Sequence, residues 1–272
     1  MKKRSAYRQR SAKKTFDSAQ TIREIYLKLS GRWGPQHWWP AETPFEVLVG
    51  AILTQNTAWT NAERAIANLR AAGKLSVEEI RTAEPKELER LVRPSGYFRQ
   101  KATRIREFVA FLDARYGGRL DAMLASPTAQ SRNELLAQKG IGPETADSVL
   151  LYAGHHPIFV VDAYTRRVLE RHEAIESKAK YDEIRELVEG ALAGVGPRKL
   201  DGTAVLDPQR PAVHEPSAMS SAAKSGPTQT YNEMHGLFVQ LGKHYCAKQN
   251  PKCEVCPLGP MLQRGADAKS RV

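Results

Sequence analysis

Gly140, Gly142 and Asp162 are the residues of this chain whose types and spacing best suit chemistry beside a phosphate. Gly140-Ile141-Gly142 forms a short turn at which the backbone can approach a phosphate closely, and Asp162 follows Gly142 by 20 residues. A turn of this kind is also an ordinary connector between two helices. Asp162 directly precedes a segment, Tyr164 to Leu169, that can be helical, so it is predicted as an N-cap, which is compatible with catalysis.

The elements that must position these residues are helices. Thr43-Pro44-Phe45-Glu46 is typical of a helix start, and Ser76 to Glu79 and Ser131 to Glu134 repeat the capping pattern. Strand signals are nearly absent. We therefore expect an all-α protein in which residues 131–153 form a helix-hairpin-helix, with a first helix from Ser131 to Gln138 and Pro143 opening the second.

The charge of the chain is unevenly distributed. Of the net charge of +11 on 272 residues, residues 1–14 carry seven Lys or Arg and no acid. This segment is predicted as a disordered basic tail that attracts polyanions. No apolar run is long enough for a membrane span or a secretory signal, which favours a cytoplasmic protein, nucleoid-associated if bacterial, with no membrane partner. A transit peptide is the alternative for a eukaryotic source.

One further segment lacks helical patterning. Residues 196–229 hold five of the sixteen prolines and little apolar periodicity, so they are predicted as a disordered insertion. Helical signals resume from Tyr231 to Leu241, before the cysteines.

With these motifs the sequence resembles the helix-hairpin-helix DNA glycosylase superfamily of the endonuclease III type, over residues 20–195 and 230–262. The resemblance implies duplex DNA as the partner, contacted by the hairpin residues Lys139, Gly140 and Gly142. Leu53-Thr54-Gln55-Asn56-Thr57 matches the motif whose glutamine enters the DNA, so Gln55 inherits that role, and Asp162 inherits that of the catalytic aspartate.

The resemblance also implies a two-lobed fold, with the DNA and the flipped base in the cleft between the lobes. One lobe is expected over residues 44–160, and the other over residues 15–43 together with 161–262. A monomer is expected.

Members of the superfamily that also cleave the strand use a lysine in the second hairpin helix, and here that position is Glu144. A carboxylate forms no imine. The resemblance therefore implies a monofunctional glycosylase in which Asp162 stabilises oxocarbenium-like charge on the sugar. Glu144 is alternatively a first-turn residue favoured by the helix dipole. Two other functions stay open: an endonuclease III-like glycosylase/lyase for oxidised pyrimidines, and a non-catalytic binder of damaged DNA.

The tryptophans point to a branch of the superfamily. All four lie between Trp33 and Trp59, and the block Trp38-Trp39-Pro40 is similar to the 3-methyladenine glycosylase branch, whose aromatic surfaces sandwich the flipped base. The resemblance implies an alkylated base as substrate and a pocket lined by Trp38, Trp39, Pro40, Trp59 and Glu144. A core aromatic cluster is the alternative. Tyr97 or Phe98 is the candidate wedge into the duplex, or a buried aromatic at a helix start.

The chain holds three cysteines, all between residues 246 and 256. Cys246, Cys253 and Cys256 match the first three ligands of the superfamily's C-terminal [4Fe-4S] loop (246–256), but the fourth position is Leu262. The sequence leaves three possibilities open: a cluster with a non-cysteine fourth ligand, a zinc site that includes His244, or a loop without metal. None of the three is required for base release.

Overall fold

The computed structural model describes residues 2–197, 207 and 211–262, with side chains from Ser18 onward. Every regular element among these residues is a helix, which confirms the all-α prediction for the described part of the chain. The chain divides into two compact units. The hairpin unit comprises residues 39–158 and 216–223, and the terminal unit comprises residues 1–38, 159–215 and 224–272. The hairpin unit thus begins at Trp39, where the sequence predicted a boundary near 44.

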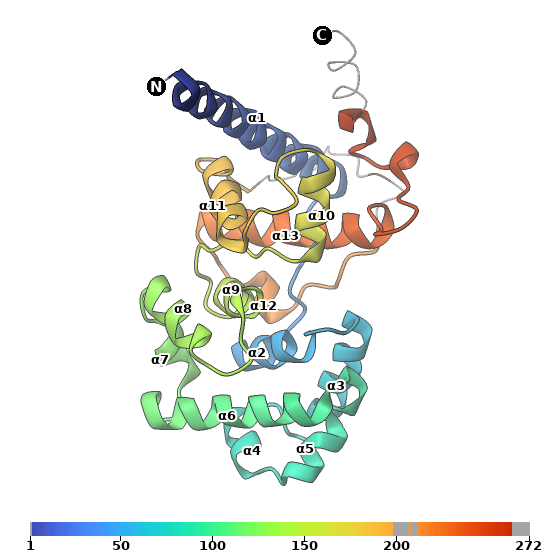
Figure 1. Cartoon of the computed structure of the whole chain (residues 1–272). Helices are drawn as coiled ribbons and strands as arrows, with labels where there is room; N and C mark the ends of the chain where they lie inside the picture. Colours follow the sequence, from blue (N-terminus) through green and yellow to red (C-terminus); the bar gives the residue numbers. More distant parts are fainter. Residues whose placement is uncertain (1, 198–206, 208–210, 263–272) are drawn as a thin grey trace. The chain divides into compact units, whose positions relative to one another are not determined.

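The elements of the hairpin unit are α2 (Pro44–Leu53), α3 (Trp59–Ala71), α4 (Val77–Thr82), α5 (Pro85–Leu91), the 3-10 helix η1 (Arg93–Ser95), α6 (Phe98–Tyr116), α7 (Leu120–Leu124), α8 (Thr128–Leu136), α9 (Pro143–Tyr152) and α12 (Ala218–Ser221). The longest helix of the hairpin unit, α6, packs against α2, α4, α5 and α7 (Figure 1). Helix α2 packs against α9, which places the end of α2 beside the hairpin.

Local capping chemistry explains where several of these helices begin. The Thr43 hydroxyl accepts a hydrogen bond from the Glu46 N–H at 3.1 Å, and Ser76 caps α4 in the same way. Ser131 does not start a helix as predicted, because α8 already begins at Thr128 after Pro127. The Ser131 side chain is buried and donates to the Met123 carbonyl at 3.0 Å. A serine that binds a distant carbonyl leaves the same sequence pattern as a cap.

The terminal unit contains α1 (Lys2–Trp33), α10 (Ala163–Arg171), α11 (Tyr181–Ala191), α13 (Gly226–His244) and the 3-10 helix η2 (Cys253–Val255). Helix α13 packs against α10 and α1, and α1 also packs against α11. The apolar face of α1 is fully buried at Ile22, Ile25, Tyr26, Leu29 and Trp33. Helix α10 therefore packs along α13, which in turn packs against α1.

The structure differs from the predicted disordered tail (1–14) over residues 2–14. Helix α1 begins at Lys2 and includes this segment, whose side chains lie outside the description. The segment holds no glycine or proline, and lysine, arginine and alanine favour helix, so no residue in it interrupts the helical backbone.

The predicted insertion at 196–229 is wrong over residues 211–229. This part includes α12 and the start of α13, whereas residues 198–206 and 208–210 lie outside the described residues. The Ser217 hydroxyl accepts from the Ala41 N–H at 3.2 Å, and Met219 beside it is buried. Such long-range contacts order a segment that carries no helical periodicity of its own.

No helix in the described part of the chain combines the length and the apolar character that crossing a membrane requires.

Candidate active site

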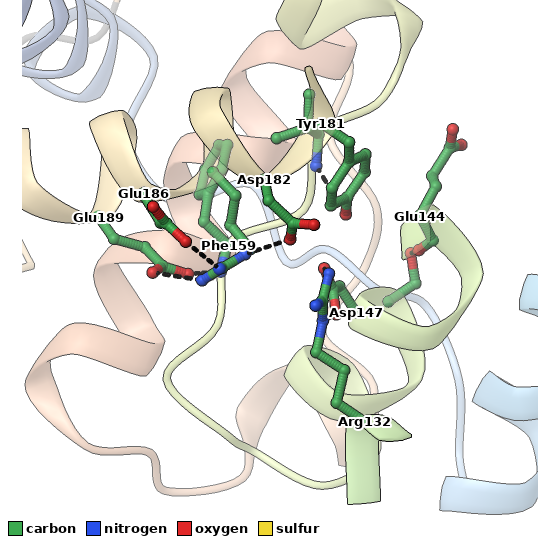
Figure 2. Close-up of polar contacts among 11 residues, drawn as sticks. Arg132, Glu144, Asp147, Phe159, Tyr181, Asp182, Glu186 and Glu189 are labelled. Atoms are coloured by element: carbon green, nitrogen blue, oxygen red, sulfur yellow. Dashed lines mark hydrogen bonds and ion pairs between the residues drawn. The ribbon is translucent and has the colours of Figure 1, made fainter. Parts of the chain in front are cut away.

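Asp162 stands at the start of α10, as its N-cap. Its Oδ1 accepts a hydrogen bond from the Thr165 N–H at 2.7 Å. The extended segment before it is held by α11: the Phe159 N–H donates to the Glu189 carboxylate at 2.9 Å, and the Val161 N–H donates to the Tyr181 hydroxyl at 3.3 Å (Figure 2). Arg185 in turn pairs with Glu189 at 2.7 Å. The backbone that carries the carboxylate is therefore fixed on both sides.

The second oxygen of Asp162 faces a histidine that the sequence did not single out. His235 Nε2, on α13, lies 3.5 Å from Asp162 Oδ2, and both side chains are nearly buried. Burial alone would raise the pKa of Asp162, but the His235 ring and the hydrogen bonds from Thr165 outweigh burial and lower the pKa below its usual value. Asp162 is thus held as a carboxylate anion, which suits the stabilisation of positive charge rather than proton donation.

The hairpin brings Gly140 and Gly142 together, and the two glycines differ in what they require. Gly140 has a φ of +81°, and a Cβ there would lie 2.2 Å from Arg104 Nε, so only glycine fits. Gly142 has an extended conformation, and a Cβ added there meets nothing within 4 Å. The chain itself does not demand glycine at 142, which leaves this side of the turn open to a partner.

A buried ion pair holds the two hairpin helices together. The Arg132 guanidinium, on α8, donates to the two carboxylate oxygens of Asp147, on α9, at 2.7 and 3.2 Å (Figure 2). The Asp147 side chain is fully buried. A bidentate ion pair of this kind restricts the angle between α8 and α9, and therefore the conformation of the turn that joins them.

Gln55, the predicted DNA-entering residue, contacts the hairpin directly. Its amide nitrogen donates to the Gly140 carbonyl and to the Thr145 hydroxyl, each at 2.9 Å. Its amide oxygen accepts from Arg104 at 2.6 Å. In this conformation Gln55 joins the end of α2 to the hairpin, and Arg104 is a neighbour that the sequence did not reveal.

Lys139, in the turn, and Glu144, in the first turn of α9, are both exposed. Figure 2 shows the Glu144 carboxylate extending away from α9 and from the Arg132–Asp147 pair. The Glu144 carbonyl accepts from the Ser148 hydroxyl at 2.7 Å, within the helix. Both side chains are therefore accessible at the N-terminal end of α9.

Two of the predicted pocket residues, Trp39 and Trp59, pack together in the hairpin unit. Their rings meet edge to face with centroids 4.9 Å apart, and Tyr152 lies 5.4 Å from Trp39. A Cβ at Gly50 would lie 3.2 Å from the Trp39 ring, so glycine permits this close packing against α2. Tyr152, on α9, also belongs to this cluster. The sequence did not identify it as a candidate pocket residue.

Trp38 belongs to the terminal unit rather than to that cluster. Its ring packs against His214 at 5.2 Å, and Lys243 Nζ lies 5.4 Å from the ring centroid. Pro40 is half-buried at a tight turn in which the Ala41 N–H donates to the Trp39 carbonyl. Neighbours in sequence thus contribute to different units.

Tyr97 projects from the loop before α6. It is 66% exposed and has a left-handed φ of +46°, which fits a side chain displayed for a partner rather than a buried aromatic. Phe98 is half-buried between the guanidinium groups of Arg93 and Arg99.

A buried lysine braces this loop against the end of α2. Lys101 is 1% exposed, and its ammonium donates to the Leu53 carbonyl at 2.9 Å and to the Ser95 carbonyl at 2.7 Å. These carbonyls lie two residues before Gln55 and Tyr97. Burial, with a contribution from Arg104, lowers the pKa of Lys101 to about 8.

The cysteine loop is attached to α10 by arginines. Arg171 donates to Cys246 Sγ at 3.0 Å, and Arg167 donates to the Cys246 carbonyl. Burial raises the pKa of the Cys256 thiol, and the neighbouring cysteines Cys246 and Cys253 add to the rise.

The residues of this loop do not fit a four-thiolate cluster. Leu262 occupies the fourth position, and within the described residues no three His, Cys, Asp or Glu side chains are arranged to hold a metal ion. The predicted cluster and the zinc alternative with His244 both stay predictions, and the chemistry that a carboxylate offers at Asp162 requires neither.

Comparison with known families matches residues 49–193 to the model of the HhH-GPD superfamily of base excision DNA repair proteins. The match covers the hairpin, Gln55 and Asp162. The chain belongs to the HhH-GPD superfamily. It is therefore a DNA repair glycosylase. The predicted superfamily and fold are confirmed.

Relatives of this HhH-GPD protein cover most of the chain. A protein of Methanocaldococcus jannaschii, assigned as a DNA repair glycosylase, is 39% identical over 88% of this chain and 94% of its own length. Endonuclease III of Thermotoga maritima is 29% identical over 86% of this chain and 89% of its own length.

Solved structures show the same fold. The H. pylori 3-methyladenine DNA glycosylase MagIII, bound to 1,N6-ethenoadenine, is 27% identical, with a TM-score of 0.64 over 83% of this chain and 97% of that chain. An endonuclease III in a non-covalent complex with DNA has a TM-score of 0.67 at 20% identity, over 93% of this chain and 98% of that chain, which shows the fold alone.

The Lys101 brace predicts a pH-dependent stability. Replacing Lys101 with methionine leaves the Leu53 and Ser95 carbonyls without their donor, and we expect a loss of about 2 kcal/mol in the free energy of unfolding at pH 7. The folded-state pKa is about 8 against 10.5 for an ordinary lysine, so between these values the unfolded chain binds more protons than the folded one. Wild-type stability should therefore rise across this window relative to Lys101→Met.

Urea denaturation at several pH values measures this difference. The exposed Lys86 provides the control, because Lys86→Met should change neither the stability nor its pH dependence. Equal stability of wild type and Lys101→Met at all pH values would show that the brace contributes nothing.

Proposed function

We propose that this protein is a monofunctional N-glycosylase that hydrolyses the glycosidic bond of alkylated bases, of the 3-methyladenine type, in duplex DNA. The observation that carries the proposal is the ionised carboxylate of Asp162, held at the start of α10 by Thr165 and faced by His235. A fixed anion stabilises the oxocarbenium-like charge that develops on the sugar as the base leaves. It also assists the attack of water on the sugar C1′.

The chemistry at the hairpin supports release without strand cleavage. The amine of a bifunctional enzyme must reach the sugar, and the exposed residue at the matching position of α9 is Glu144. Lys101 has a lowered pKa, as a nucleophilic lysine does, but it is buried and donates to two carbonyls. Its amine is therefore committed to the brace.

The aromatic residues support an alkylated purine as the substrate. Trp39, Trp59 and Tyr152 form one cluster, and a purine nucleotide alkylated at N3 or N7 carries positive charge that aromatic faces attract. The likeness to MagIII in complex with an ethenoadenine agrees with this choice. Pro40 and Glu144, which belong to the same unit as this cluster, are proposed as further pocket residues, and Trp38 stays a prediction.

The hairpin supports duplex DNA as the partner. The first turn of α9 begins at Gly142, which has no side chain to cap its N–H groups, and Lys139 is exposed beside it. Backbone N–H groups and the positive end of the helix dipole suit a DNA phosphate. Gln55 and Tyr97 are proposed to enter the duplex on either side of the flipped base.

Asp162→Asn should lower the rate of 3-methyladenine release from alkylated duplex DNA by about 100-fold or more, because it removes the stabilising charge. DNA affinity should be unchanged within about twofold. Since the pKa of Asp162 is lowered, the wild-type rate should fall on the acid side only below the ordinary aspartate pKa of about 3.9. Single-turnover excision at several pH values gives the rates, and fluorescence anisotropy gives the DNA affinity. Full activity of the variant contradicts the mechanism, and binding without release of any lesion points to a damaged-DNA binder.

Glu144→Lys should create a borohydride-trappable adduct with DNA, because it restores an amine at the position that bifunctional relatives use. Wild type and the control Asn133→Lys, which places a lysine at another exposed hairpin position, should give none. Adducts are counted by gel electrophoresis after reduction. A wild-type adduct would overturn the monofunctional proposal and favour a lyase acting through another amine.

Gly142→Ala should weaken DNA binding by about tenfold, because the added methyl group occupies the open side where a phosphate approaches. Folding should be unaffected. Gly190→Ala, at a second position with nothing within 4 Å, is the matched control and should bind as wild type does. Equal affinities of the two variants, measured by fluorescence anisotropy, would exclude the hairpin as the phosphate contact.

A further inference from the structure

We infer that His235 is a positioning residue for the Asp162 carboxylate, an inference that rests on the proposed glycosylase function. Its Nε2 lies 3.5 Å from Asp162 Oδ2, while Oδ1 is taken by the Thr165 N–H. A carboxylate with one fixed oxygen can still rotate about its Cβ–Cγ bond. A partner on the second oxygen stops this rotation and orients the remaining lone pairs.

The environment of His235 holds the ring in place. The imidazole is nearly buried and packs edge to face against Phe159, with ring centroids 6.4 Å apart. The same Phe159 ring contacts Tyr231 and Phe238, which lie on the same face of α13. The backbone N–H of Phe159 is itself held by Glu189. The ring is thus confined by aromatic side chains whose own positions are fixed.

The backbone that carries His235 is equally constrained. A Cβ at the next residue, Gly236, would lie 2.9 Å from the Gln36 Cβ and 3.1 Å from the Trp38 Cβ, so α13 packs closely against the segment that carries Trp38. Helix α13 also packs along α10. His235 therefore reaches the start of α10 from a helix that is held on two sides.

Charge and geometry both favour a positioning role over a general acid or base. His235 is buried behind Asp162, so it acts on the reaction only through the carboxylate. An imidazole N–H stabilises the anionic form, and a fixed orientation reduces the reorganisation needed when charge appears on the sugar. A core histidine with a purely structural role would instead support folding and DNA binding alike.

The experiment compares His235→Leu with His235→Gln, whose side-chain amide keeps a donor near the position of Nε2. We expect His235→Leu to lower the single-turnover rate of base release by roughly tenfold or more, with DNA affinity unchanged within about twofold. His235→Gln should restore most of the rate. In the Asp162→Asn background, His235→Leu should have no further effect. His172→Gln, at the other end of α10, is the control and should behave as wild type does.

A spectroscopic measurement keeps the inference separate from the proposed function. The ¹⁵N resonance of His235 Nε2 should shift on Asp162→Asn, whether or not any base is released. A wild type that releases no base would overturn the glycosylase proposal but leave this coupling testable.

Three results would overturn the inference: an unchanged resonance, a wild-type rate in His235→Leu, or a loss of DNA affinity as large as the loss of rate. An additive effect of His235→Leu in the Asp162→Asn background would also contradict it. If His235→Leu fails to fold, His235→Gln and the resonance shift still decide between a positioning and a structural role.

Discussion

The N-terminal N–H groups of α10 must find acceptors, and the carboxylate of Asp162 supplies one of them. This single requirement places the charge, since the side chain that caps Thr165 cannot turn away from the helix end. The hydrogen bond and the His235 ring keep the carboxylate ionised although it is nearly buried. A residue that caps a helix is thereby also a fixed anion, so its structural and proposed catalytic roles have the same physical origin.

The same requirement is met differently at α9. Gly142 has no side chain to cap this helix, and the positive end of its dipole suits an external anion. The buried Arg132–Asp147 pair and Gln55 hold the turn in shape from either side. One helix start is therefore capped from within the chain, and the other is the proposed contact for a DNA phosphate.

Charged side chains elsewhere satisfy backbone groups that the helices leave unpaired. Lys101 donates to carbonyls at the end of α2 and in η1, and Glu189 accepts the N–H of Phe159 in the extended segment before α10. Arg167 does the same for the Cys246 carbonyl. Each joins segments that are distant in sequence: Lys101 lies 48 residues from Leu53, Glu189 lies 30 from Phe159, and Arg167 lies 79 from Cys246.

Local patterns in the sequence identified the helix starts at Thr43, Ser76 and Pro143, because capping depends on residues within one turn. They could not separate Ser131 from a true cap, since its hydroxyl binds a carbonyl eight residues away. They also did not predict the helical structure within residues 211–229, where the Ser217 hydroxyl accepts a hydrogen bond from the distant Ala41 N–H. Sequence periodicity depends on residues that are close along the chain. It carries no information about partners that are distant in sequence.

The sequence by itself determined the helical class, the hairpin, the candidate Asp162 and the substitution at Glu144, because residue type and short spacing specify these features. Only the tertiary structure decided that Trp38 and Trp39 belong to different units, that Lys101 braces the loop before α6 against the end of α2, and that His235 faces Asp162. Those pairings join residues far apart in the chain. They follow from how helices pack, because packing brings together positions that no local pattern marks as neighbours.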